Sequence, residues 1–257
     1  MNSAIGISQT DFAKTENSTF SWKNLYKIAG AAAALMAALI PLQVAIYIVW
    51  PPPKTITGWF TFFQTDNLLA MLDMDLLLIV DQAFMILIFL ALYVSLRKTS
   101  PAFMLVALTL GLVGITAYFA SSPVFNMLAL SSQYATATTE AERAMYLAAG
   151  QGIFSMWTGT GYTVGYVIQG LGLLIVALVM LRSPNFSKAI AIVGVIAGIF
   201  SLVPSNAGML GLIFSLGSLI PLEIWSVMLA YRFFQLGKTG NASENAAVRT
   251  QTAAGQA

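Results

Sequence analysis

Residues 72–96 read LDMDLLLIVDQAFMILIFLALYVSL, an apolar run that nevertheless contains Asp73, Asp75, Asp81 and Gln82. A helix of roughly 20 apolar residues, rising about 1.5 Å per residue, crosses the hydrocarbon layer of a membrane. An ionised carboxylate in that layer costs several kcal/mol, so Asp81 must face other helices or water, or be protonated. The stretch therefore predicts a membrane helix whose acids are sheltered by neighbouring helices.

The composition predicts that the whole chain is an integral membrane protein. Of its 257 residues, 58% are hydrophobic and 9% are charged, whereas a soluble domain has about 25% charged residues. The chain has no cysteine and no histidine, which excludes disulfides and thiolate chemistry and removes the commonest metal ligand. We therefore assign no catalytic residue, no metal and no cofactor, and an enzyme is the less favoured class. The net charge of +2 gives no indication of nucleic-acid binding.

Apolar runs separated by polar or proline-rich segments predict an all-α bundle of six transmembrane helices. The predicted spans are 28–50, 72–96, 102–120, 153–181, 189–203 and 208–231. The bundle occupies 28–236 and follows a polar cytoplasmic leader at 1–27. Residues 237–257 have too little apolar surface to order themselves, so we expect a disordered cytoplasmic tail.

The basic residues predict the orientation of these spans. Ten of the twelve Lys and Arg residues fall on one side of the predicted topology, and only Lys54 and Arg143 fall on the other. Basic residues in short loops accumulate on the cytoplasmic side of a membrane protein. We therefore expect both termini to lie in the cytoplasm.

Two features are predicted on the opposite, outer face. Four aromatic residues stand within 59–63, a density typical of a segment in the headgroup region, where aromatic rings settle. A loop packed over the mouth of the bundle explains them equally well. The sequence TEAE at 139–142 has the spacing of a capping box, and it predicts a short amphipathic surface helix from about 140 to 149.

Polar residues inside the predicted spans form the candidate site. At 100° per residue, Asp75 and Gln82 lie on one stripe of the second span, and Asp81 lies next to that stripe. No Lys or Arg lies deep in any predicted span, so desolvation favours the neutral form of these acids, which is the condition for carrying a proton or binding a cation transiently. The predicted ligand-binding residues are Asp75, Asp81, Gln82 and Glu223, with Tyr162 and Gln169 of the fourth span as weaker candidates.

Two functions remain open from these residues. The first is a small-molecule or cation binding or transport protein with an acidic cavity between spans two, four and six, which predicts a pocket of roughly 300 Å³ or more. The second is a structural or assembly subunit, in which the acids only tie helices together and glycine-rich faces form homo- or hetero-oligomers. Pairs at 161/165 and 194/198 have the GxxxG spacing that lets helix backbones approach closely, and packing is the favoured interpretation of them.

Several stretches resemble a known family. LDMDLL at 72–77, NMLALS at 126–131 and LEIW at 222–225 are similar to segments of a bacterial family of six-span membrane proteins, the domain of unknown function 4386. The resemblance covers most of the chain, from about 28 to 236. It implies a multi-pass protein of the bacterial inner membrane, surrounded by membrane lipids, and it implies no activity.

Overall fold

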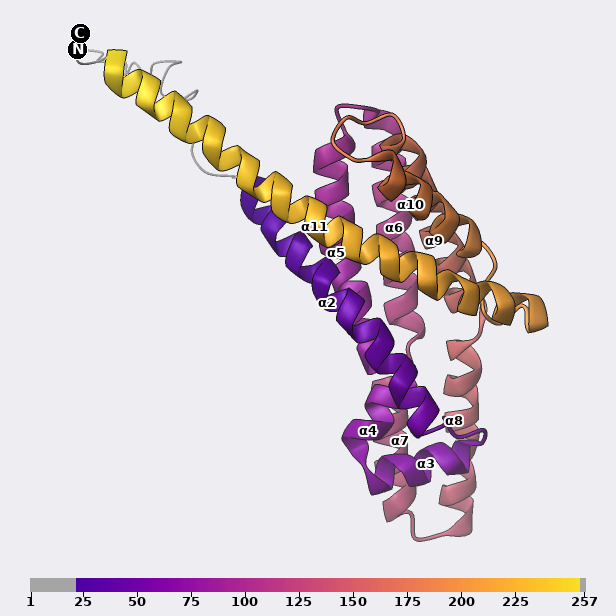
Figure 1. Cartoon of the computed structure of the whole chain (residues 1–257). Coiled ribbons are helices and arrows are strands. Elements are labelled where there is room, and N and C mark those ends of the chain that lie inside the picture. The colour runs from indigo at the N-terminus through magenta and orange to yellow at the C-terminus, as the bar shows by residue number, and fades with distance from the viewer. Residues whose placement is uncertain (1–21, 255–257) are drawn as a thin grey trace, which may run out of the picture.

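The computed structural model describes the backbone of residues 22–254 and the side chains of 22–238. This part of the chain is helical, with no strand (Figure 1). Its elements are α2 (Trp22–Val49), α3 (Ile56–Thr65), α4 (Asn67–Met71), η1 (Leu72–Leu76), α5 (Leu77–Leu96), α6 (Pro101–Ser121), α7 (Val124–Thr136), α8 (Glu140–Trp157), α9 (Thr160–Met180), α10 (Lys188–Phe200) and α11 (Gly208–Ala254). The predicted all-α class is confirmed for these residues. Of the predicted leader, 1–21 lie outside the described residues and 22–27 already belong to α2.

Five helical segments are long and apolar enough to cross a membrane. They are Trp22–Val49, Asn67–Leu96, Pro101–Thr136, Glu140–Met180 and Gly208–Lys238. The remaining predicted span, 189–203, corresponds to α10, which has only 13 residues. Such a helix is about 20 Å long, shorter than the roughly 30 Å hydrocarbon core. The described chain thus has five full-length candidate spans and one shorter apolar helix.

The most extensive helix contact joins α6 and α9, which run antiparallel. A Cβ added at Gly114 would lie 2.7 Å from the carbonyl oxygen of Gly165, and one added at Gly172 would lie 2.9 Å from that of Ala107. Only residues without a side chain allow backbones to approach this closely. Of the predicted glycine pair on this span, Gly165 therefore packs inside the chain, whereas Gly161 is exposed.

The glycines of α10 are covered in the same way. A Cβ at Gly194 would lie 2.6 Å from the indole nitrogen of Trp225, and one at Gly198 would lie 2.9 Å from the Cα of Leu174. Trp225 belongs to α11 and is fully buried. The glycine face of α10 therefore packs against α9 and α11 of its own chain.

The short helix α10 runs antiparallel to α9 and stops half-way along it. A Cβ at Gly170, in the middle of α9, would collide with the carbonyl of Ser201, which caps the end of α10. The non-helical residues 201–207 then continue beside the first half of α9. There the Asn206 side chain donates to the Thr158 carbonyl at 2.7 Å and to the Thr163 hydroxyl at 2.6 Å.

The last helix, α11, begins at Gly208, whose φ of 63° favours glycine, and runs antiparallel to α2 (Figure 1). Its backbone continues as a helix to Ala254, which differs from the disordered tail predicted for 237–257. Several alanines in this extension favour helix over coil. Side chains after Lys238, and residues 255–257, lie outside the described residues.

The long helices share one hydrophobic core. A separate hydrophobic core lies beyond one end of them, where α3, α4, α7 and α8 meet (lower part of Figure 1). We refer to these four helices as the cap. Trp59, Phe60 and Phe63 of α3 are at most 1% exposed and pack with Val124 and Met127 of α7. These three rings are thus buried in protein, so the packing interpretation holds for them and the headgroup interpretation is wrong. The packed segment is a helix rather than a loop.

The predicted surface helix is present and longer than expected. Thr139 caps α8 by accepting a hydrogen bond from the Glu142 N–H at 3.2 Å, and Glu142 accepts one from the Thr139 N–H at 3.1 Å. This is the predicted capping box. Gly150 and Gly152 follow the predicted end but do not interrupt the helix, and α8 continues to Trp157. Between α6 and α8, Val124–Thr136 forms the further helix α7.

Most of the described basic side chains lie at the end opposite the cap, although Lys54 and Arg143 lie at the cap end. Asp66 caps α4, and Glu140 and Glu142 open α8, all in the cap. At the opposite end, Arg97 follows α5 and Lys188 begins α10. This opposite end is called the basic end below.

Candidate functional site

The acids of residues 72–96 lie on and after a π-helical turn. Asp73 and Asp75 belong to η1, and Asp81 and Gln82 lie in the following α-helix, α5. A π-turn adds a residue to one turn of helix, so it changes the angle between residues before and after it. Asp75 and Gln82, which a regular helix places on one stripe, consequently have different neighbours.

Asp75 is fully buried and its carboxylate is hydrogen-bonded. The hydroxyls of Tyr118 and Ser122, both at the end of α6, donate to its two oxygens. The Tyr162 ring lies 6.1 Å from the Tyr118 ring, but the Tyr162 hydroxyl pairs with Ser205 at 2.9 Å. Asp75 and Tyr162 therefore belong to a satisfied polar cluster between η1, α6 and α9.

Asp81 lines a cavity of about 180 Å³ at the meeting point of α2, α5, α9, α11 and the end of α10. The polar part of its wall consists of Asp81, Gln82, Tyr166, Gln169 and Ser201, and the rest is apolar or glycine. Three of the six predicted residues, Asp81, Gln82 and Gln169, are thus brought together. We call this space the Asp81 cavity.

Two glutamines close one wall of the Asp81 cavity. The Gln169 side-chain amide donates to the Gln82 side-chain oxygen at 2.8 Å, across the contact between α9 and α5. This bond ties together two elements that are 87 residues apart in sequence. It also fixes the direction of both amides beside the carboxyl group of Asp81.

Two acids of this region each have a buried carboxylate oxygen without a partner. Oδ1 of Asp81 and Oε2 of Glu223 are buried and make no hydrogen bond within the described part of the chain. Glu223 is not among the lining residues, but it lies near enough for its charge to repel that of Asp81. No Lys or Arg lines the cavity. An ionised, unpaired carboxylate at the buried Asp81 would cost several kcal/mol, a cost that a bound proton or cation would remove.

Comparison with known families decides the membership of the chain. The family model described as "Domain of unknown function (DUF4386)" matches residues 28–237, which include η1 and every residue of the Asp81 cavity. The chain is a DUF4386 protein. The resemblance seen in the sequence is therefore confirmed. Neither a curated protein nor a solved structure matches the chain.

Three residues of this DUF4386 protein were missed by the sequence argument. Tyr166 and Ser201 line the Asp81 cavity, and Asp73 is 1% exposed with neither carboxylate oxygen hydrogen-bonded among the described residues. Asp73 carried the same signal as Asp75, an acid in an apolar run. Nothing in the local sequence distinguishes Tyr166 and Ser201 from other polar residues of their spans.

The volume of the Asp81 cavity limits what this DUF4386 protein can hold there. Its roughly 180 Å³ lie below the predicted size and below the about 300 Å³ at which drug-sized ligand pockets begin. The polar wall presents carboxylate, amide and hydroxyl oxygens, which are the ligands that hard cations prefer. The arrangement therefore suits a proton, a small cation or a molecule of a few atoms.

Proposed function

We propose that this DUF4386 protein binds, and carries through the bacterial inner membrane, a proton or a small cation at the Asp81 cavity. The observation that carries this proposal is the buried, unpartnered oxygen of Asp81 in a cavity with no basic residue. Ionisable groups inside a membrane are rare and usually serve ion or proton movement. Neutralising Asp81 removes its repulsion with Glu223, so occupancy is favourable.

The proposal includes a topology of six crossings with both termini in the cytoplasm. The fifth crossing is formed by α10 together with the non-helical residues 201–207. Support comes from the basic end, where Arg97, Arg182 and Lys188 lie near the ends of α5, α9 and α10. The cap then lies on the outer side, as the positive-inside rule requires.

The glycine contacts favour binding over an assembly role. The structural alternative needs glycine-rich faces that remain available to other membrane proteins. Gly165, Gly194 and Gly198 instead contact helices of this chain. The close packing of Gly194 and Gly198 explains their GxxxG spacing without a partner, whereas it leaves the unpartnered acids unexplained.

Replacing Asp81 with asparagine tests the proposal. We expect the melting temperature of the detergent-purified protein to rise on acidification or on addition of an alkali cation, because either neutralises a buried charge. At a cation concentration 100-fold above Kd, the rise is about 5–10 °C. Asp81→Asn is expected to fold, because the amide fills the same space without charge. It should lose the cation response and keep only the part of the acid response that Asp73 and Glu223 supply. Differential scanning fluorimetry between pH 5 and 9, with Na⁺ or K⁺ titrations, measures it.

The matched control is Asp66→Asn. Asp66 is exposed and caps α4, and asparagine caps a helix about as well as aspartate. This variant should respond like the wild type. A pH-sensitive dye inside proteoliposomes adds the transport readout, in which Asp81→Asn should slow dye response at least about tenfold. If Asp81→Asn keeps the full thermal and transport responses, the cavity is not the binding site.

A further inference from the structure

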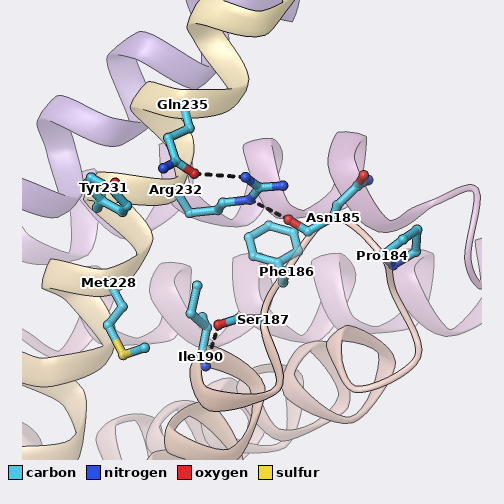
Figure 2. A pocket seen from close by; sticks show the side chains of 9 residues that line it. All are labelled: Pro184, Asn185, Phe186, Ser187, Ile190, Met228, Tyr231, Arg232 and Gln235. Atoms are coloured by element: carbon cyan, nitrogen blue, oxygen red, sulfur yellow. Dashed lines mark hydrogen bonds between the residues drawn. The ribbon is translucent and has the colours of Figure 1, made fainter.

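A larger cavity, of about 460 Å³, lies at the basic end between the α9–α10 connection and α11. It is lined by Pro184, Asn185, Phe186, Ser187, Ile190, Met228, Tyr231, Arg232 and Gln235 (Figure 2). None of these residues belongs to the Asp81 cavity. We call this second space the Arg232 cavity.

The Arg232 cavity contains a cation without a carboxylate partner. The Nε of Arg232 donates to the Asn185 carbonyl, and its Nη1 donates to the Gln235 side-chain oxygen at 2.8 Å. Within the described residues its Nη2 makes no hydrogen bond, and no Asp or Glu lines the cavity. A guanidinium held by neutral groups keeps its charge and free donors for a phosphate, which it binds well because its planar fork matches the oxygens.

The start of α10 adds to this positive potential. Ser187 caps the helix by accepting a hydrogen bond from the Ile190 N–H at 3.4 Å, and both residues line the cavity. The N-terminus of a helix carries a partial positive charge that favours anions. Arg232 and this helix end therefore act on the same space from two elements.

Beside the polar groups, the Arg232 cavity has an apolar wall. Phe186 lies below the Arg232 side chain, and Met228 and Ile190 continue the wall away from it (Figure 2). Tyr231 at the rim is 68% exposed, as is common for aromatic residues at a membrane interface. A charged end and an adjoining apolar wall fit an amphiphile better than a soluble anion.

We propose that the Arg232 cavity binds the headgroup of an anionic phospholipid of the cytoplasmic leaflet. Arg232 and the start of α10 contact the phosphate, and Phe186, Ile190 and Met228 contact the upper acyl chain. Basic pockets between membrane helices on the cytoplasmic side commonly hold such lipids. The inference relies on the topology proposed above, but not on ion binding at Asp81.

Native mass spectrometry of the detergent-purified protein tests the lipid site. The probes are dioleoylphosphatidylglycerol and dioleoylphosphatidylcholine, titrated separately. We expect the wild type to retain the anionic lipid at several-fold lower concentration than the zwitterionic one. Arg232→Gln should weaken binding of the anionic lipid about five- to tenfold, the effect expected of one lost basic contact. The control Arg182→Gln removes a charge at the same end but outside the cavity, and should bind like the wild type.

Arg232→Gln also removes the hydrogen bond to the Asn185 carbonyl, and it could weaken lipid binding by disordering that loop. A second variant therefore tests the site without changing Arg232. Met228→Trp leaves Arg232 and its two hydrogen bonds in place but fills part of the cavity, and it should also weaken binding about fivefold or more. Equal retention of both lipids by the wild type, or wild-type binding by Met228→Trp, overturns the proposal. The proposal is also overturned if millimolar glycerol phosphate stabilises the protein as much as the anionic lipid does. In that case the site recognises the phosphate alone, and the acyl chain adds nothing to binding. We expect these variants to keep the cation response that Asp81→Asn removes, so the two proposals fail independently.

Discussion

Gly114→Leu is expected to prevent α6 and α9 from docking and to remove most of the folded protein. The new side chain starts 2.7 Å from the Gly165 carbonyl oxygen and 2.9 Å from the Gln169 backbone nitrogen. Backbone atoms on a helix cannot turn aside as a side-chain end can, so the helices must separate. Overpacking a core usually costs about 1–3 kcal/mol, and here we expect more than about 3 kcal/mol. The yield of monodisperse protein in size-exclusion chromatography and the melting temperature measure the loss.

Gly152→Leu is the control for that experiment. Gly152 lies in α8, and a Cβ there meets no atom within 4 Å. The same chemical change should leave folding intact and add helix propensity of just under about 1 kcal/mol. Equal yields and melting temperatures for the two variants contradict the close approach of α6 and α9.

Asp75→Leu is expected to lower the free energy of unfolding by about 3 kcal/mol. The change leaves the buried hydroxyl of Tyr118 and the partly buried hydroxyl of Ser122 without the acceptor that both now use. Each buried polar group without a partner costs about 1–3 kcal/mol. Asp81→Asn, at an acid without partners on Oδ1, should by contrast be neutral or stabilising. Thermal and urea unfolding followed by tryptophan fluorescence compare the two acids.

A double variant separates lost hydrogen bonds from lost volume at Asp75. Adding Tyr118→Phe to Asp75→Leu removes the orphaned hydroxyl, so part of the stability should return. If the double variant is as unstable as the sum of the two single variants, the hydrogen bond between Tyr118 and Asp75 does not carry the effect. Wild-type stability of Asp75→Leu alone leads to the same conclusion.

The positions of the long helices could be predicted because the length of each apolar run, its hydropathy and the charged or proline residues that end it agree. The third span was expected at 102–120 and is found at Pro101–Ser121, where Arg97 and Pro101 mark the preceding turn.

The cap was harder to predict. Its helix α7 mixes apolar residues with Ser, Thr and Gln, and its burial depends on α3, which is about 60 residues away in sequence.

The candidate site was predicted in part, because acids in an apolar run need shelter wherever the chain places it. That argument brought Asp81, Gln82 and Gln169 into one cavity. It failed to separate Asp75, because the π-turn that rotates it has no recognisable sequence signal. Glu223 lies close to Asp81 but off the cavity wall, a distinction that depends on how α11 is rotated against its neighbours.

The end of α10 half-way along α9 has a consequence for solvent. In the proposed topology, residues 202–207 lie beside the first half of α9 without regular helical hydrogen bonding, at a depth where lipid offers no partner to the peptide groups. Irregular backbone persists there only when protein covers it or water reaches it, and Asn206 is exposed. In the proposed topology, water therefore reaches this flank, and Ser201 belongs both to the irregular segment and to the wall of the Asp81 cavity.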